Sequence, residues 1–220
     1  MNATTFSCRF VEIRVTLPVI YNSLGDAIMK KLMVPAFIAL ISFAINANAE
    51  ENAPGNWHVA AKVAHISFTD SVLEHVGLDE SVYYGIEAYA KAAPKFYVGG
   101  EVGYVNEKGA FSNASYVGTE LTYIPIEVNI KYFIQDTGRL SFAIGGGVSQ
   151  NYVEENTYYY GTYTWEEWLF GVQAFADLSY RFGDRYFAGV NAKFQLTEDM
   201  EDSSYGYDNI RLGAHVGVVF

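Results

Sequence analysis

The sequence predicts an all-β fold in which eight antiparallel strands close into one up-and-down barrel. Three observations carry this prediction. Segments of about ten residues alternate between apolar and polar side chains, which is the period of a strand with two different faces. Short turns and long polar connections follow one another along the chain. Residues 50–220 leave about 21 residues for each strand with its connection, so we expect no second domain.

The strands are predicted in chain order from this alternation. The clearest are "FYVGGEVGYV", "IPIEVNIKY", "WLFGVQAFADLSYRF" and the final "NIRLGAHVGVVF", in which apolar side chains share one parity. The same rhythm, bounded by turn signals, predicts the others. The predicted strands are 57–68, 81–91, 96–105, 117–134, 140–150, 165–182, 186–196 and 209–220.

The connections predict how the barrel is placed. The compositions of "AAP", "QDTGR" and "GDR" predict tight turns. Long polar loops are predicted at "TDSVLEHVGLD", "NEKGAFSNAS", "YVEENTYYYGTY" and "TEDMEDSSYGYD". An even number of strands with short turns at one end and long loops at the other is typical of a transmembrane barrel of the bacterial outer membrane. Because an unpaired strand edge is costly in hydrocarbon, the last strand is expected to pair with the first.

A secretion signal precedes the predicted barrel. Two lysines follow Met29, an apolar run comes next, and the small residues Ala47 and Ala49 mark a cleavage site. The sequence therefore predicts a cleavable signal peptide. The predicted parts of the chain are an over-extended N-terminus outside the fold (1–28), the signal peptide (29–49) and the outer-membrane β-barrel domain (50–220).

Composition excludes several classes of function. The 220 residues carry a formal net charge of −11, and half of them are hydrophobic. Such a chain cannot neutralise a phosphate backbone, so we expect no nucleic-acid partner. The single cysteine, Cys8, precedes the signal peptide, which leaves no disulfide or thiolate metal site in the mature chain. No metal-ligand spacing or phosphate-binding glycine loop occurs, and we expect no catalytic residues, cofactor or metal.

Two features indicate that the polar face points into the barrel. Glycines such as Gly99, Gly103 and Gly147 share the parity of the charged residues, as a narrow interior requires. Aromatic rings near the ends of the apolar face suit a membrane interface. The inward charges are nearly balanced, so we predict a polar network that fills the interior. Its predicted members are Lys62, Glu87, Glu101, Glu127, Lys131, Asp177, Arg181, Lys193, Arg211 and His215.

A soluble lipocalin-like barrel is the alternative with the same alternation. Such a barrel turns its apolar face inward and binds a small apolar ligand. Gly55 and Trp57 form a Gly-x-Trp pattern like the one lipocalins have at the first strand. The glycine parity, the placement of aromatic residues and the lack of a helix after the last strand favour the transmembrane barrel.

Several segments resemble a known family. The signal peptide, "GNWHVAAKVAHISF", "YIPIEVNIKYFI" and the terminal "HVGVVF" are similar to the small eight-stranded outer-membrane β-barrel family, which includes OmpA-type transmembrane domains, opacity-type and OmpW-type porin-like proteins. The resemblance spans the mature chain and implies the outer membrane of a Gram-negative bacterium. It also implies that the barrel-assembly machinery recognises the end of the last strand. The implied assembly signal is Leu212, Val216, Val218 and Phe220.

The predicted loops are strongly acidic and rich in tyrosine. Lys108 is the only lysine or arginine in these loops, and their acidic residues are Asp70, Glu74, Asp79, Glu80, Glu107, Glu154, Glu155, Glu166, Glu167, Glu198, Asp199, Glu201, Asp202 and Asp208. We expect these loops to face the cell exterior beside outer-membrane lipid and lipopolysaccharide. A solvated acidic rim and a rim that binds divalent cations are both open interpretations. Tyrosines at 158–160 suit either a lipid boundary or an extracellular partner.

The predicted function is that of a non-catalytic, monomeric barrel with a structural or surface-interaction role. A narrow porin-like channel for ions or small solutes is the main alternative, followed by a lipocalin-like binder and a lipid A-modifying enzyme. His65 and Ser67 share a face, as in the acyl-transfer pair of lipid A deacylases. Phe68 follows the serine where those enzymes have asparagine, which argues against the enzyme.

Overall fold

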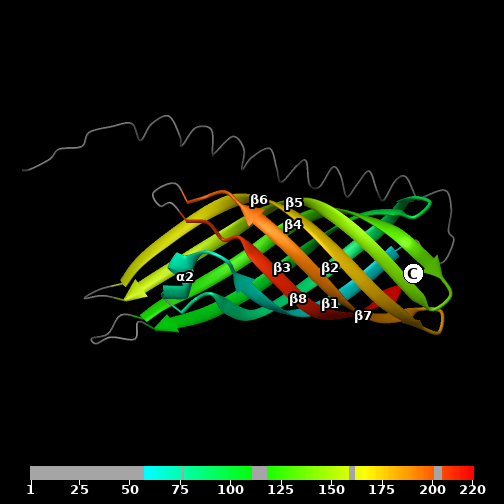
Figure 1. The fold of residues 1–220 in the computed structure, drawn as a ribbon, viewed down its shortest axis with the longest axis horizontal. Coiled ribbons are helices and arrows are strands. Elements are labelled where there is room, and N and C mark those ends of the chain that lie inside the picture. Colours follow the sequence, from blue (N-terminus) through cyan, green and yellow to red (C-terminus); the bar gives the residue numbers. More distant parts are fainter. Residues whose placement is uncertain (1–56, 76, 111–117, 159–161, 201–204) are drawn as a thin grey trace, which may run out of the picture. The chain divides into compact units, whose positions relative to one another are not determined.

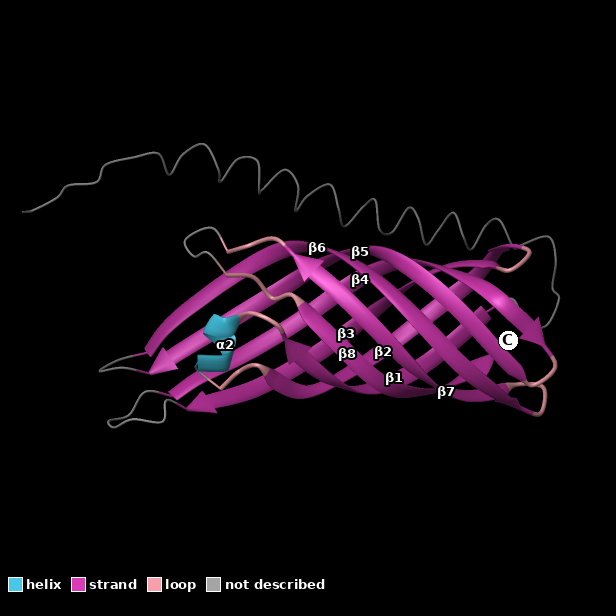
Figure 2. Cartoon of the chain, viewed as in Figure 1, coloured by secondary structure: helices cyan, strands magenta, loops and turns pink. Residues whose placement is uncertain are grey.

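The computed structural model describes residues 57–75, 77–110, 118–158, 162–200 and 205–220. The predicted signal peptide, the residues before it and the cleavage residues Ala47 and Ala49 lie outside the described residues. Figure 1 shows strands wound round one axis, and Figure 2 shows a short helix near one end. The elements are β1 (Trp57–Phe68), α2 (Ser71–His75), β2 (Glu80–Ala93), β3 (Phe96–Ala110), β4 (Gly118–Thr137), β5 (Leu140–Tyr158), β6 (Thr162–Phe182), β7 (Tyr186–Thr197) and β8 (Asn209–Val219).

The strands form a closed barrel in sequence order, and each strand is antiparallel to the next. The closing pair is β1 with β8, which runs from His58 opposite Val219 to Phe68 opposite Asn209. Beyond it, the backbone nitrogen of Phe220 donates to the carbonyl of Trp57 at 2.9 Å. The predicted all-β, eight-stranded antiparallel barrel is confirmed, and its last strand closes on its first as expected.

Short turns join the strands at the end that holds the C-terminus (Figure 1). Gly138 and Gly183 have φ values of 75° and 65°, and Lys95 has 67°. These left-handed conformations reverse the chain within a few residues, and glycine adopts them without steric cost. This end, which we call the turn end, agrees with the tight turns predicted from composition.

The opposite, outer end differs from the prediction. The sequence predicts loops at "NEKGAFSNAS" and "YVEENTYYYGTY", but β3 continues to Ala110, β5 continues to Tyr158 and β6 begins at Thr162. Those two loops were therefore predicted too long, because polar residues on the strands were taken as loop signals; the rest of each predicted loop lies outside the described residues. Of the long connections, the one between β1 and β2 contains α2, which was also not predicted.

The two faces of each strand follow the predicted parity through the middle of the barrel. Val172 on β6 is 45% exposed, whereas its neighbour Gln173 is 6% exposed. Large apolar side chains are exposed on the outward face of every strand, and the charged side chains of the same segments are buried. A lipocalin has the opposite arrangement, with its apolar side chains inside the barrel.

Interior glycines make room for aromatic rings. A Cβ at Gly103 would lie 2.1 Å from Cε2 of Tyr83, and a Cβ at Gly145 would lie 2.2 Å from Cζ of Phe175. Carbon atoms that are not bonded to each other do not approach this closely. Any larger residue at either position would therefore displace a ring. The glycines that share parity with the charges therefore let side chains from neighbouring strands fill a narrow interior.

Candidate functional site

A chain of alternating charges occupies the middle of the barrel. Its eight members are all buried and come from every strand except β5. Four are cations and four are anions, so the chain is formally neutral. The ion pairs, with their N···O distances, are Asp177–Lys131 (2.7 Å), Lys131–Glu87 (3.4 Å), Glu87–Lys62 (2.7 Å), Lys62–Glu101 (2.9 Å), Glu101–Lys193 (2.8 Å), Lys193–Glu127 and Glu127–Arg211 (2.6 Å).

Neutral polar side chains add hydrogen bonds to this chain. The Tyr83 hydroxyl donates to Glu101 at 2.6 Å, and the Arg211 guanidinium lies 4.8 Å above the Tyr83 ring. Arg211 also donates to Gln195 at 2.8 Å, and Asn129 donates to Glu127 at 3.0 Å. Such partners offset part of the cost of burying an ion pair, while Nε and Nη1 of Arg211 and Oδ1 of Asp177 are buried without a hydrogen-bond partner among the described residues.

The sequence prediction omitted these neutral residues. Gln195 and Asn129 share the parity of the charged residues on β7 and β4, so the same parity rule identifies them. Tyr83 and Tyr123 are fully buried inside the barrel. Sequence reasoning missed them because it assigned aromatic rings to the lipid-facing side.

Two predicted members of the network lie apart from the charge chain. His215 is buried on β8 opposite Lys62, and its Nε2 lies 2.9 Å from the Ser179 hydroxyl. Arg181 is half-buried at the last residues of β6, on the rim of a recess at the turn end. The structure therefore places nine of the ten predicted network residues in the buried interior and Arg181 at its edge.

An aromatic layer fills the interior toward the turn end. Tyr89, Tyr97, Phe133 and Phe175 form a buried cluster with Ala143. The Tyr97 and Phe133 rings meet edge to face with centroids 5.0 Å apart. The ammonium group of Lys131 lies 4.0 Å from the centre of the Tyr89 ring, which joins the aromatic layer to the charge chain.

An apolar layer fills the interior toward the outer end. It includes Ile66, Val105, Leu121, Val153 and Leu169, which point inward from five strands. The connections add further side chains to the same cluster. They are Leu73 of α2, Leu78, Met200 and Tyr207. We call this cluster the outer plug, because it packs directly above the charge chain inside the mouth of the barrel.

The outer plug ends in a carboxylate that is held by two tyrosines. The Tyr205 hydroxyl donates to Glu155 at 3.2 Å, and the Tyr207 hydroxyl donates to the same carboxylate. Burial, reinforced by the negative charge of Glu155, raises the pKa of both tyrosines well above its usual value. Both hydroxyls therefore stay protonated donors at neutral pH and fix the β7–β8 connection to β5.

Four strands project beyond the closed barrel at the outer end. β6 pairs with β5 as far as Thr162, but its pairing with β7 begins only at Gly171. β3 pairs with β4 as far as Ala110, but its pairing with β2 ends at Tyr104. The outer parts of β3, β4, β5 and β6 thus form a sheet with two lateral edges, which we call the projecting sheet.

The projecting sheet holds many of the acidic residues that the sequence predicts in loops. Glu107, Glu154, Glu155, Glu166 and Glu167 all lie on its strands, as does Lys108. Tyr158 and Trp165 are exposed there as well. Trp168 packs against Tyr152 with ring centroids 5.3 Å apart, on the outward face. Tyr159 and Tyr160 lie outside the described residues.

The residues of the implied assembly signal lie on one side of β8. Leu212, Val216 and Phe220 are exposed on the outward face, and Val218 is half-buried there. Recognition of these residues by an assembly machinery stays a prediction.

The candidate acyl-transfer pair has no catalytic geometry. His65 and Ser67 both point outward near the end of β1, as predicted. The carboxylate of Glu80 lies 3.9 Å from Nε2 of His65, which is beyond hydrogen-bonding distance. Within the described ranges, no group of three or more His, Cys, Asp or Glu side chains could hold a metal ion. In the same ranges, no helix is long and apolar enough to cross a membrane.

Comparison with known proteins identifies the fold. No protein-family model and no curated protein matches the chain. Among solved structures, Neisserial surface protein A is 15% identical with a TM-score of 0.56, and the match covers 77% of this chain and 100% of that chain. Ail, the attachment invasion locus protein of Yersinia pestis, is 9% identical with a TM-score of 0.52, covering 76% of this chain and 100% of Ail. The outer membrane protein OprG of Pseudomonas aeruginosa is 10% identical with a TM-score of 0.51, covering 75% and 93% of the two chains. The chain has the fold of the small eight-stranded outer-membrane β-barrels.

Proposed function

We propose that this protein spans the outer membrane of a Gram-negative bacterium as a closed, non-catalytic barrel and presents the projecting sheet to a partner at the cell surface. The outward band of apolar side chains supports the membrane location, because it would otherwise expose large apolar surface to water. The single observation that carries the surface role is the edge of β6. Residues 162–169 pair with β5 on one side and, within the described part of the chain, with no strand on the other.

This edge has only part of the usual protection of an exposed strand. Natural edge strands carry charged side chains, above all lysine, or proline or bulges that prevent another strand from adding to them. Residues 162–169 read "TYTWEEWL" and contain no lysine, proline or bulge, so that Glu166 and Glu167 are the only protecting side chains among them. Tyr163 is 67% exposed and Trp165 is 43% exposed. An extended segment of a partner can pair with this backbone while its side chains contact the two rings.

The charges of the sheet favour a basic partner. Glu154 on β5 lies directly opposite Glu166 on β6, and Glu167 follows on the same edge strand. Like charges in a cross-strand pair are destabilising, so a cation that approaches them relieves the repulsion. A second copy of the same edge would bring more carboxylates together, which favours a monomer in the membrane. The partner is therefore proposed to be an extended, lysine- or arginine-rich segment of another protein.

The neighbours support the surface role by their printed names. One is a surface protein, another an attachment invasion locus protein, and a third an outer membrane protein. Contact of the outward band with outer-membrane lipid and lipopolysaccharide, and recognition of Leu212, Val216, Val218 and Phe220 by the barrel-assembly machinery, are parts of the same proposal. Non-catalytic action is the remaining part of the same proposal.

The membrane location is tested by cell fractionation and by electrophoresis with and without heating. We expect the processed chain in the outer-membrane fraction, with a band that shifts on heating as a folded barrel unfolds. Recovery of a monomeric chain from periplasmic fluid, soluble without detergent, would refute the location.

The surface role is tested with a fluorescent peptide of alternating lysine and valine, whose binding to the refolded barrel is followed by anisotropy. We expect Tyr163→Lys to weaken binding, because it places a cation on the open edge. Tyr158→Lys is the matched control, since it removes an exposed tyrosine and adds the same charge on β5, which is paired on both sides. Equal effects of the two variants would show a purely electrostatic attraction and would contradict edge pairing.

A further inference from the structure

The turn end of the barrel collects positive charge. Five of the 14 lysines and arginines of the chain lie in or beside its three turns. They are Lys91, Lys95, Arg139, Arg181 and Arg185. The acidic residues at the same positions of the chain are Asp136, near the end of β4, and Asp184, in the β6–β7 turn. The described outer end has the opposite balance, with Lys108 as its only lysine or arginine among many carboxylates.

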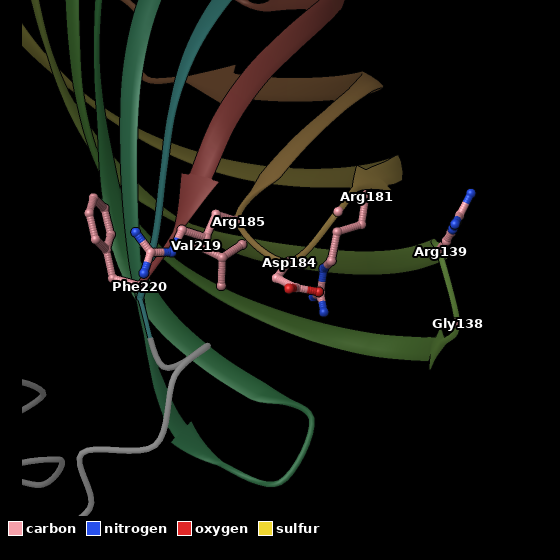
Figure 3. Close-up of a pocket in the computed structure, with 8 residues that line it drawn as sticks. Gly138, Arg139, Arg181, Asp184, Arg185, Val219 and Phe220 are labelled. Atoms are coloured by element: carbon pink, nitrogen blue, oxygen red, sulfur yellow. The ribbon is translucent and has the colours of Figure 1, made fainter.

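Three of these cations, Arg139, Arg181 and Arg185, line a recess between two turns and the last residues of the chain. Figure 3 shows Arg181, Asp184 and Arg185 of the β6–β7 connection beside Val219 and Phe220, with Arg139 on the neighbouring β4–β5 turn. Arg139 and Arg185 are exposed, and both lie in turns. Their guanidinium groups can therefore contact an anion at the rim of the recess.

An aromatic collar surrounds the barrel at the same level. It consists of six outward-facing rings from five strands or strand ends, all exposed except the half-buried Tyr132: Phe96, Tyr132, Tyr180, Phe182, Tyr186 and Phe220. Rings of this kind mark the depth of the lipid headgroups in transmembrane barrels. Arg139 donates to the Tyr180 hydroxyl at 3.4 Å, which ties one cation directly to the collar. The turn cations therefore sit at the depth of the lipid phosphates.

We propose that the turn end binds the phosphate groups of anionic phospholipids in the leaflet that the turns face, through Arg139 and Arg185. This inference rests on the proposed membrane location. A guanidinium group offers paired N–H donors that match two phosphate oxygens, and it is less strongly hydrated than an ammonium group. A lipid phosphate is favoured over a free anion because the acyl chains of the same molecule contact the collar beside each arginine.

The experiment uses spin-labelled lipids and the mature barrel refolded in phosphatidylcholine vesicles. The spectrum of a labelled lipid separates molecules immobilised on the protein from those in the bulk bilayer. We expect labelled phosphatidylglycerol to be enriched over labelled phosphatidylcholine in the immobilised fraction, by at most about fivefold for each arginine near the surface. The Arg139→Gln/Arg185→Gln variant should lose this preference. Lys108→Gln, which removes a cation at the outer end, should keep it.

The outcomes separate this inference from the proposed location. A spectrum with no immobilised lipid would show that the barrel is not inserted, which contradicts the membrane location itself. Immobilised lipid without a phosphatidylglycerol preference, or a preference that the double variant keeps, would overturn the phosphate site alone. Loss of the preference when inorganic phosphate replaces chloride at constant ionic strength would indicate a site for free anions and would also overturn it.

Discussion

Glu127 has no exposed surface and accepts hydrogen bonds from cations on two strands, Lys193 of β7 and Arg211 of β8. Glutamine keeps the size of the side chain but removes its charge, so two buried cations lose their shared counter-ion. We expect Glu127→Gln to lower the free energy of unfolding by about 3–5 kcal/mol, as for other broken buried pairs. Urea unfolding of the barrel refolded in detergent micelles measures this change.

Glu120→Gln is the matched control on the same strand. Glu120 lies on the outward face of the projecting sheet, 3.6 Å from the exposed ammonium of Lys108. Surface ion pairs of this kind contribute about 0–1 kcal/mol. A loss at Glu127 as small as the loss at Glu120 would show that the charge chain does not stabilise the barrel.

Residue by residue, parity predicts which side chains enter the interior but not which of them meet. Lys62 has both Glu87 and Glu101 as ion-pair partners, at 2.7 and 2.9 Å. These contacts depend on strand register, and register depends on turn lengths and on the tilt at which a closed barrel staggers its strands. Alternation within one strand contains none of that information. The sequence prediction therefore contains all eight members of the charge chain, together with His215 and Arg181, which lie apart from it, but not the order in which the eight pair.

At the scale of the strand, the sequence prediction placed the strand ends too early in the projecting sheet. In the middle of β4, Ile126 faces outward and Glu127 inward, but near its start Glu120 and Thr122 face outward while Leu121 points inward. The polarity of the two faces is exchanged because the outer plug replaces the charge chain inside and, with the proposed membrane location, water replaces lipid outside. The alternation itself continues unbroken. A search for this exchange of parity would have predicted the longer strands.

The same exchange predicts where the membrane ends on β6. Val172 and Thr164 both face outward on this strand, eight positions apart. An arginine in place of Val172 would lie in hydrocarbon, so we expect Val172→Arg to lower the free energy of unfolding in lipid bilayers by about 2–4 kcal/mol. Thr164→Arg places its arginine on the projecting sheet, in water, and should change the free energy of unfolding by no more than about 0.5 kcal/mol. Urea unfolding in vesicles measures both, and equal losses would contradict a boundary between these positions.

For the molecule as a whole, three interior layers lie in series along the barrel axis. The aromatic cluster around Tyr97 lies toward the turn end, the neutral charge chain lies in the middle, and the outer plug around Leu121 lies toward the outer end. An ion that crosses would have to break ion pairs which have no water to replace them, and then pass through an apolar layer. The arrangement therefore favours a closed barrel over the narrow porin-like channel that the sequence left open.

This closure predicts the electrical behaviour of the barrel. In planar bilayers we expect no stable open level, because each layer blocks the path independently. A variant with a weakened outer plug, Leu73→Ala/Leu78→Ala/Met200→Ala, should also stay closed, since the charge chain below it is intact. A reproducible open level in the unmodified barrel would support the channel instead. An open level in the variant alone would show that the outer plug is the gate and that the charge chain lets ions pass.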